Sequence, residues 1–109
     1  MATFEEILKE CHGTRKYRPV VDAIPYANLI GLDYQRFGND VIFKLPDNPD
    51  NIGNPILPAV HGGVVGGFME LSAAIHLVMM LDTPAMPKIV DFSLDYLRPV
   101  RGGRDTFAE

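Results

Sequence analysis

The stretch that decides the fold is HGGVVGGFMELSAAIHLVMM, residues 61–80, which joins a glycine-rich turn to the longest apolar run of the chain. With the period of an α-helix, this run is apolar on nearly every face, a pattern typical of a helix buried on all sides. A helix over residues 62–81 would be about 30 Å long at ~1.5 Å per residue, which is also the length of a membrane span. Glu70 in its middle, four glycines in its first turns and the absence of basic or aromatic flanks argue against a span. We therefore predict a central helix wrapped by a sheet and ended by residues 82–84.

Glu70 is the anomaly of this helix, because a buried carboxylate is costly unless it is paired or functional. Its neighbours at three and four positions are Gly66, Gly67, Ala73 and Ala74, none of which can pair with it. These small residues leave a strip along which a ligand or another backbone could approach the carboxylate. Two interpretations stay open: Glu70 belongs to a functional site, or it reaches solvent at the rim of a subunit.

Length and composition place limits on the kind of protein. With 109 residues, 47% hydrophobic content and a net charge of −4, the chain is expected to form one domain with one core. The acidic balance argues against nucleic acid as a partner. One cysteine, Cys11, excludes a disulfide framework. No basic region followed by an apolar stretch begins the sequence, so no signal peptide is expected and the cytoplasm is the predicted location.

Short helices are predicted before the first strand. Thr3 and Glu6 have the spacing of a capping box, which together with apolar residues at helical spacing predicts a helix over residues 1–12, ended by the glycine that follows. The basic segment 14–21 is expected to be a solvated linker. Residues 24–30, with a proline suited to the first turn, predict a further short helix.

Alternation of apolar and polar residues predicts the strands. Residues 32–37 and 41–45 flank Gly38-Asn39-Asp40, residues suited to a tight turn, and are expected to form a hairpin. Lys88 to Leu97 alternates as a half-buried strand does, and residues 105–109 begin a further strand. A long apolar helix cannot be covered by so few strands. We therefore expect apolar surface that is either exposed to solvent or covered by other chains.

Most catalytic and ligand-binding motifs are absent. The sequence GGVVGG lacks the lysine and hydroxyl of a phosphate-binding loop. The three histidines lack the spacing of metal ligands, so no metal site is predicted. What remains is His61-Gly62-Gly63 at a helix N-terminus, where free N–H groups and the positive end of the helix dipole can bind a developing oxyanion. The alternative is that these glycines only permit close packing.

The combination of motifs resembles one family. The hairpin, the proline-rich loop at 46–58, HGG with an acid nine residues after its histidine, and DYLRPV at 95–100 are similar to hotdog-fold acyl-CoA thioesterases of the phenylacetate-degradation, 4-hydroxybenzoyl-CoA thioesterase-like type. The resemblance covers residues 24–109, the expected hotdog domain, and leaves 1–23 as an N-terminal helix and linker. It implies an α+β hotdog fold, an antiparallel sheet wrapped around a long central helix, whose last strands would lie beyond Glu109. It also implies an active site between the two subunits of a dimer, which often pairs into a tetramer.

The resemblance also implies roles for individual residues. Glu70 matches the catalytic carboxylate, acting as nucleophile or as general base, Gly62 the residue whose N–H polarises the thioester carbonyl, and His61 the histidine that orients the site. Relatives often carry Asn or Gln where this chain has Pro55, so the adjacent Asn54 is the candidate for that role. The candidates for substrate binding are Gly63, Phe68, Ser93, Arg98 and Arg101, the arginines facing the phosphates of coenzyme A.

The function expected from this resemblance is hydrolysis of an acyl-CoA thioester by a homo-oligomer. No cofactor is expected beyond the coenzyme A of the substrate, and no metal, nucleic acid or membrane partner. Two alternatives remain: a hotdog module that binds acyl-CoA or oligomerises without catalysis, and a truncated, inactive remnant.

Overall fold

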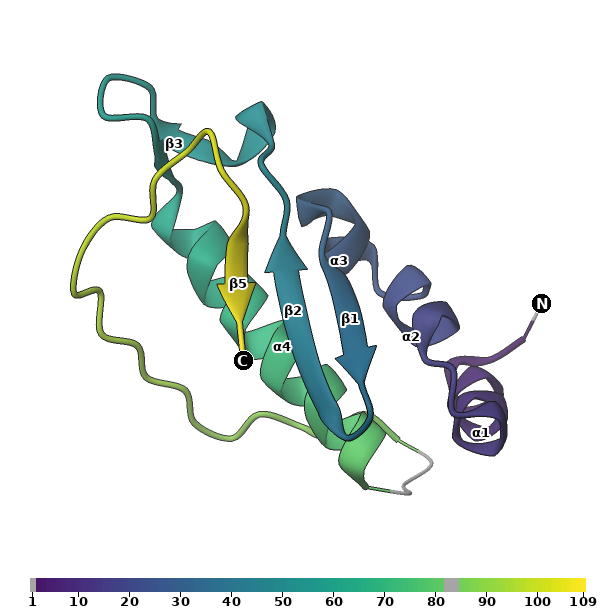
Figure 1. Ribbon diagram of the computed structural model, residues 1–109. Coiled ribbons are helices and arrows are strands. Elements are labelled where there is room, and N and C mark those ends of the chain that lie inside the picture. The colour runs from purple at the N-terminus through teal and green to yellow at the C-terminus, as the bar shows by residue number, and fades with distance from the viewer. Residues whose placement is uncertain (1, 82–84) are drawn as a thin grey trace.

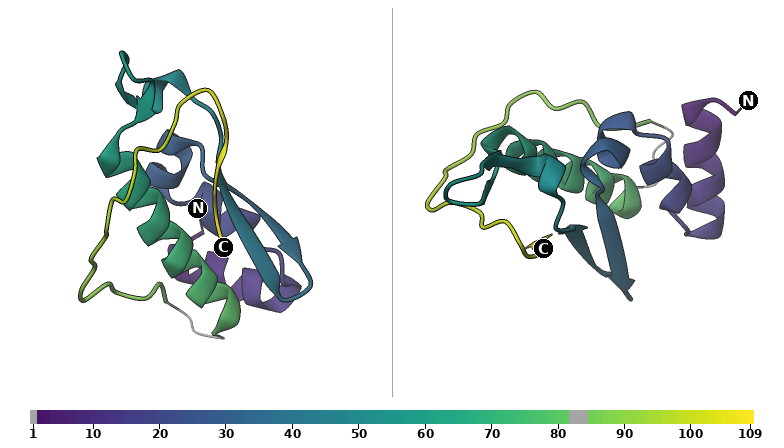
Figure 2. Two further views of the ribbon diagram at one scale, coloured as in Figure 1. Left: turned by 60° about the vertical axis from the view of Figure 1, so that its left-hand side comes forward. Right: turned by 90° about the horizontal axis from the view of Figure 1, so that it is seen from above.

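The computed structural model of this chain describes residues 2–81 and 85–109. Its longest element is helix α4, Gly62–Met80, which lies diagonally behind a three-stranded antiparallel sheet (Figure 1). The sheet runs along one side of α4, and residues 85–100 run along another (Figures 1 and 2). The prediction of an antiparallel sheet packed on a long central helix is confirmed. The residues expected to end this helix, 82–84, lie outside the described part of the chain.

The sheet is built on the predicted hairpin. Strands β1, Asp33–Phe37, and β2, Asp40–Leu45, pair antiparallel around a turn in which Gly38 has φ 62°. Strand β5, Thr106–Ala108, then pairs with the other edge of β2, so the strand order is β1-β2-β5. Every second residue of β2 is buried, which places the apolar face of the central strand against α4.

The loop after β2 is ordered and contains a second, small sheet. A 3₁₀ turn at Pro49–Asn51 leads into β3, Ile52–Asn54, which pairs antiparallel with β4, Ala59–Val60. The backbone N–H of His61 donates to the Asn51 carbonyl at 2.8 Å. This small sheet therefore fixes the point at which the chain enters α4.

The N-terminal helices differ from the prediction in two places. Helix α1, Phe4–Thr14, begins at the predicted cap, where the Thr3 hydroxyl accepts from the Glu6 N–H, but it continues past Gly13 and ends at Arg15, which has φ 60°. A glycine ends a helix only where it takes the left-handed conformation, and here Arg15 takes it instead.

The predicted linker 14–21 was wrong in its second half, because helix α2, Arg18–Asp22, begins there. Pro19 suits a first turn, and Val20 and Val21 are buried in the core. Helix α3, Pro25–Ile30, confirms the short predicted helix, and Gly31 closes it with φ 79°.

One hydrophobic core joins all of these elements. Its fully buried members come from α1, α2, α3, the sheet and α4, and include Leu8, Val20, Ile30, Leu45, Phe68, Ile75, Val78 and Met79. Helix α4 is long and apolar enough to cross a membrane by length and composition alone, but its buried residues pack in this shared core as those of a core helix do. Its other side is only half covered, since Met69, Leu77 and Met80 are 41–46% exposed.

The strand predicted over Lys88–Leu97 is wrong. These residues form an irregular segment that pairs with no strand in the described part of the chain (Figure 1). A strand needs a neighbouring backbone to satisfy its N–H and C=O groups, and β5, the nearest edge of the sheet, pairs only with β2. Alternation of apolar and polar residues indicates which face of a segment is buried, but it does not show whether a neighbouring strand is present to pair with it.

Candidate active site

The first turn of α4 contains the donor that the sequence singles out. A helix begins with four N–H groups that have no partner within the helix. In α4, the Gly63 N–H donates to Nδ1 of His61 at 2.9 Å, and the N–H groups of Val64 and Val65 donate to the His61 carbonyl at 2.9 and 3.1 Å. Of the four N–H groups in this first turn, only that of Gly62 has no acceptor among the described residues. The positive end of the helix dipole therefore presents one open donor.

His61 is held in place from both sides. It caps the helix with its own side chain, and its backbone N–H donates to the Asn51 carbonyl of the turn before β3. Gly53 of β3 lies so close that an added Cβ would be 2.8 Å from the His61 Cα. The position of His61 is therefore fixed at the start of α4, where its imidazole accepts from the Gly63 N–H.

Asn54 lies at the end of β3, opposite Ala59 of β4, the strand that leads directly to His61. Its Oδ1 accepts from the N–H groups of Ile56 and Leu57 at 3.0 and 3.2 Å, so it shapes the exposed loop between the two strands. The structure thus brings Asn54 to the same end of the molecule as the Gly62 N–H. The side-chain amide keeps its N–H groups available to a ligand.

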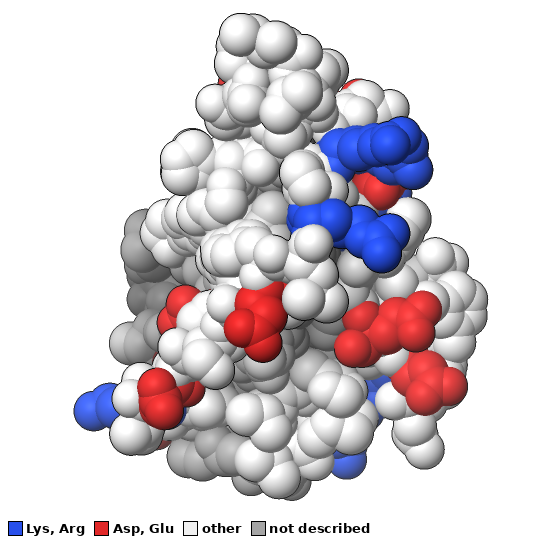
Figure 3. Space-filling view, turned by 90° about the vertical axis from the view of Figure 1, so that its left-hand side faces the viewer, with Lys and Arg blue, Asp and Glu red and all other residues white. Residues whose placement is uncertain are grey.

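The basic turn, residues 98–104, contains Arg98, Arg101 and Arg104 and reaches the same end of α4 through the backbone. Val60 N–H donates to the Val100 carbonyl at 2.8 Å, Gly102 N–H donates to the Pro58 carbonyl at 2.6 Å, and Arg101 forms a β-bridge with Ala59. Among the described residues, no acidic side chain forms an ion pair with Arg98 or Arg101. On the face that carries this segment, basic side chains gather in the upper part and acidic ones mostly below (Figure 3).

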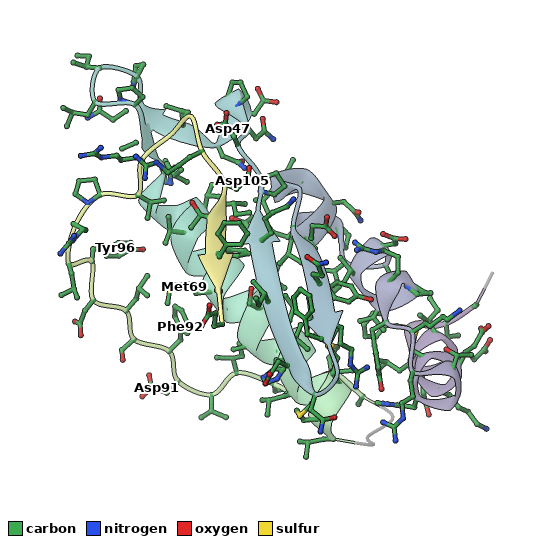
Figure 4. All side chains as sticks on the ribbon, viewed as in Figure 1. Asp47, Met69, Asp91, Phe92, Tyr96 and Asp105 are labelled. Atoms are coloured by element: carbon green, nitrogen blue, oxygen red, sulfur yellow. The ribbon has the colours of Figure 1, made fainter. Side chains whose placement is uncertain are left out.

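Two carboxylates hold this turn against the start of the small sheet. Asp47 accepts through Oδ1 from the Gly103 N–H at 3.0 Å, and Asp105 accepts through Oδ1 from the Asp47 N–H at 2.9 Å (Figure 4). Gly103 has φ 79°, which favours glycine. The conformation of the basic turn is therefore set by hydrogen bonds between residues that lie 56 and 58 positions apart in the sequence.

Glu70 is partly buried and lies eight residues after Gly62 on the same helix. Among the described residues, its carboxylate forms no hydrogen bond or ion pair. The strip of small residues beside it is not open, because two tyrosines occupy it. A Cβ on Gly66 would be 3.3 Å from the Tyr96 hydroxyl, and a Cβ on Gly67 would be 2.6 Å from the Tyr26 ring.

The remaining candidates lie away from this end of α4. Phe68 is 1% exposed and belongs to the core, and Ser93 is exposed on the irregular segment. The structure therefore gathers Asn54, His61, Gly62, Gly63 and Arg101, and leaves Phe68 and Ser93 outside that group.

Sequence reasoning missed Tyr96, which extends from residues 85–100 toward α4 and donates its hydroxyl hydrogen to the Gly62 carbonyl at 2.7 Å (Figure 4). The signal was present, because a large polar-tipped aromatic in the DYLRPV motif had no assigned partner.

The perturbed titratable groups lie outside this site. Burial raises the pKa of the Cys11 thiol, which keeps it protonated and argues against a nucleophilic role. The Arg18 guanidinium lowers the pKa of the Asp33 carboxyl to which it hydrogen-bonds. Residues 2–81 and 85–109 contain no cluster of three His, Cys, Asp or Glu side chains arranged to hold a metal ion.

Comparison with known proteins points to one family. The profile of the Thioesterase superfamily matches residues 57–109, which include the helix N-terminus, Glu70 and the basic turn. A crystal structure of a Chromobacterium violaceum protein from the Northeast Structural Genomics Consortium is similar over 92% of this chain and 68% of its own, with 40% identity and a TM-score of 0.67. A search of curated proteins found no significant match to this chain.

Proposed function

Because the chain belongs to the thioesterase superfamily, we propose that it hydrolyses acyl-CoA thioesters at a site formed by the Gly62 N–H of one copy and Glu70 of a second copy. Membership of the superfamily indicates thioester hydrolysis. The acyl-CoA substrate, the phenylacetate-degradation type and the roles of individual residues belong to the proposal.

The observation that carries the proposal is the single open donor at the start of α4. The thioester carbonyl accepts from the Gly62 N–H, which is the one N–H of the first turn without an acceptor in the described chain. The oxygen gains negative charge when the carbonyl carbon is attacked, so the donor and the helix dipole stabilise the transition state more than the bound substrate. His61 supports this role by engaging the neighbouring Gly63 N–H.

The distance along the helix requires a second copy. Gly62 and Glu70 are eight residues apart, which is about 12 Å at ~1.5 Å per residue. The N–H groups of the first turn point away from the helix body, so a carbonyl bound to Gly62 lies still farther from Glu70 of the same chain. One carbonyl therefore cannot meet both groups within one chain, and a two-fold dimer would supply the carboxylate from its other copy.

The chemistry then follows from the carboxylate. Acting as general base, Glu70 takes a proton from water as the water oxygen bonds to the carbonyl carbon, and the tetrahedral intermediate breaks its C–S bond to release the thiolate, which recovers a proton. Acting as nucleophile, the carboxylate forms an anhydride with loss of the thiolate, and water then hydrolyses the anhydride to the acid. Both routes end in free acid and coenzyme A without a cofactor or metal.

The basic turn suits the other end of the substrate. Arg98 and Arg101 are exposed and without ion-pair partners among the described residues, so they can meet the phosphates of coenzyme A. Asn54 has free amide N–H groups at the same end of the molecule and is proposed to hold water or substrate there. A cytoplasmic location remains part of the proposal, because acyl-CoA esters are intracellular substrates.

The experiment that tests this function compares two substitutions at Gly62. Gly62→Pro deletes the N–H and adds a ring, and the helix tolerates it because proline is favoured at the first helical position and His61 already has the extended backbone, ψ 131°, that a residue before proline adopts. Gly62→Ala keeps the N–H and places a Cβ at an ordinary 3.6 Å from the Tyr96 ring.

Thiol release from short, medium and aromatic acyl-CoAs should fall about 100-fold or more in Gly62→Pro, as expected for loss of one oxyanion donor, and stay near wild type in Gly62→Ala. Glu70→Gln should abolish turnover while the far-ultraviolet circular dichroism stays unchanged. Saturable acyl-CoA binding with no hydrolysis by wild-type protein would instead favour a non-catalytic binding module.

A further inference from the structure

We propose that Tyr96 is a positioning residue that holds the two-glycine turn of α4 so that the Gly62 N–H is aimed at the substrate carbonyl. This inference rests on the proposed function for its kinetic consequence. Its structural part, restraint of the turn by the Tyr96 hydroxyl, is testable without any substrate.

The restraint follows from the hydrogen bonds of one peptide group. The Gly62 carbonyl and the Gly63 N–H belong to the same peptide unit, which is planar. Tyr96 donates to that carbonyl at 2.7 Å, and the N–H donates to Nδ1 of His61 at 2.9 Å. The peptide is therefore held at both ends by side chains from two distant parts of the chain.

Such restraint matters because two consecutive glycines are the most flexible dipeptide the chain can offer. The peptide unit before Gly62 is fixed through the His61 carbonyl, which accepts from Val64 and Val65. With the following unit fixed by Tyr96 and His61, the rotations about the Gly62 Cα are limited from both sides. The direction of the Gly62 N–H is then set before substrate arrives, which is the condition for an effective oxyanion donor.

Two glycines of α4 leave the space in which the Tyr96 side chain packs against the helix. A Cβ on Gly62 would lie 3.6 Å from the Tyr96 ring, and a Cβ on Gly66, one turn later, would lie 3.3 Å from its hydroxyl. Any larger residue at 66 would push the hydroxyl away from the Gly62 carbonyl. The spacing of these glycines thus serves the approach of a side chain rather than that of a ligand.

The test uses Tyr96→Phe, with Tyr26→Phe as the matched control. Both remove one hydroxyl from a tyrosine packed on a glycine of α4, but the Tyr26 hydroxyl contributes no hydrogen bond to the first turn. Solvent exchange of the Gly63 amide, measured by NMR, should accelerate about 2- to 10-fold in Tyr96→Phe, the range expected for one lost hydrogen bond, and remain unchanged in Tyr26→Phe. Unchanged Gly63 exchange in Tyr96→Phe would overturn the restraint whether or not the protein hydrolyses thioesters.

Kinetics then test the positioning role. We expect kcat of Tyr96→Phe to fall about 2- to 10-fold with KM nearly constant. The same change in a Gly62→Pro background should have no further effect, because the N–H that Tyr96 aims is already absent. A loss that is equally large in both backgrounds would show that Tyr96 acts on general stability and would overturn the positioning role. Gly66→Ala should reproduce the Tyr96→Phe effect. A wild-type kcat in that variant would contradict the proposal that Gly66 leaves the space needed by the Tyr96 hydroxyl.

Discussion

Gly53 of β3 lies directly against His61, so that a Cβ on Gly53 would be 2.8 Å from the His61 Cα and 2.9 Å from its Cβ. The contact is with backbone and with the stem of the side chain, neither of which can rotate away. Gly53→Ala should therefore move His61 and the start of α4. We expect about 1–3 kcal/mol lower free energy of unfolding, as for overpacking, and a loss of at least about tenfold in kcat because the oxyanion donor is displaced.

Gly13→Ala is the control for this substitution, since Gly13 lies inside α1 and an added Cβ there meets nothing within 4 Å. Alanine should stabilise this helix by about 0.5–1 kcal/mol and leave kcat unchanged. Chemical denaturation of both variants measures the free energy of unfolding, and thiol-release assays measure kcat. Equal stability of the two variants would mean that β3 has room to retreat from His61.

The elements that the sequence predicted well are those decided by local chemistry. The hairpin depends on the turn residues around Gly38, α1 begins at the capping hydroxyl of Thr3, and α4 follows its apolar run. Residues 88–97 were predicted as a strand because alternation is local, whereas pairing depends on a partner far away in sequence. The prediction also ended α1 at Gly13, whereas the helix runs to Thr14 and is closed by Arg15 in the left-handed conformation.

The candidate site shows the same division. Helix physics pointed to the turn His61-Gly62-Gly63, and the family resemblance pointed to Gly62 within it. The engagement of the Gly63 N–H by His61 and the role of Tyr96 depend on side-chain directions that a sequence pattern does not contain. The hydrogen bonds that join Asp47 to Gly103 and to Asp105 span more than 50 residues, so no spacing rule could find them.

Asp47 leads to a prediction about the coenzyme end of the substrate. Its carboxylate accepts from the Gly103 N–H and so fixes the turn that carries Arg101 and Arg104. Asp47→Ala should raise KM for acyl-CoA about 3- to 10-fold, consistent with disordered charge-assisted contacts to phosphate, with little change in kcat. Asp47→Asn, which keeps an acceptor, should have a smaller effect.

The matched substrate for that experiment is the same acyl group on N-acetylcysteamine, a thiol without phosphates. Its KM should be the same for wild type and Asp47→Ala. A parallel rise of KM for both substrates would place the effect of Asp47 on the acyl end and contradict the assignment of the basic turn.

The pair formed by Arg18 and Asp33 predicts a small, pH-dependent contribution to stability. The Arg18 hydrogen bond lowers the pKa of Asp33 in the folded chain below 3.8. A lowered folded pKa contributes stability that is complete above the unfolded value and is lost as pH falls through the folded value. Because the two side chains are 47% and 45% exposed, we expect only about 0.2–1 kcal/mol.

Asp33→Asn, which keeps the acceptor for the Tyr34 N–H, should lower the free energy of unfolding by that amount in urea titrations at neutral pH. The difference from wild type should shrink as the pH falls below the ordinary range of an Asp carboxyl, and it should vanish once the wild-type carboxyl is protonated in the folded chain as well. A difference that persists undiminished in acid would mean that packing of the Arg18 side chain over Tyr34, at 4.6 Å, carries the effect instead of charge.

The composite site predicts that two inactive variants restore each other. In Gly62→Pro every site lacks its donor, and in Glu70→Gln every site lacks its carboxylate. When the two proteins are unfolded together and refolded, half of the dimers are mixed, and each mixed dimer contains one intact site and one site with both defects. We therefore expect about a quarter of wild-type thiol release from the mixture, against almost none from either variant refolded alone.

The reverse mixture separates this arrangement from a site within one chain. When wild type is refolded with an equal amount of the Gly62→Pro/Glu70→Gln double variant, both sites of every mixed dimer carry one defect, so the mixture should show about a quarter of the activity of the same total amount of wild-type protein. If one chain held both groups, every wild-type chain would stay active and about half would remain, and the first mixture would recover nothing. Such a result would contradict the distance argument, because Glu70 would then have to span about 12 Å of its own helix to reach a carbonyl bound at Gly62.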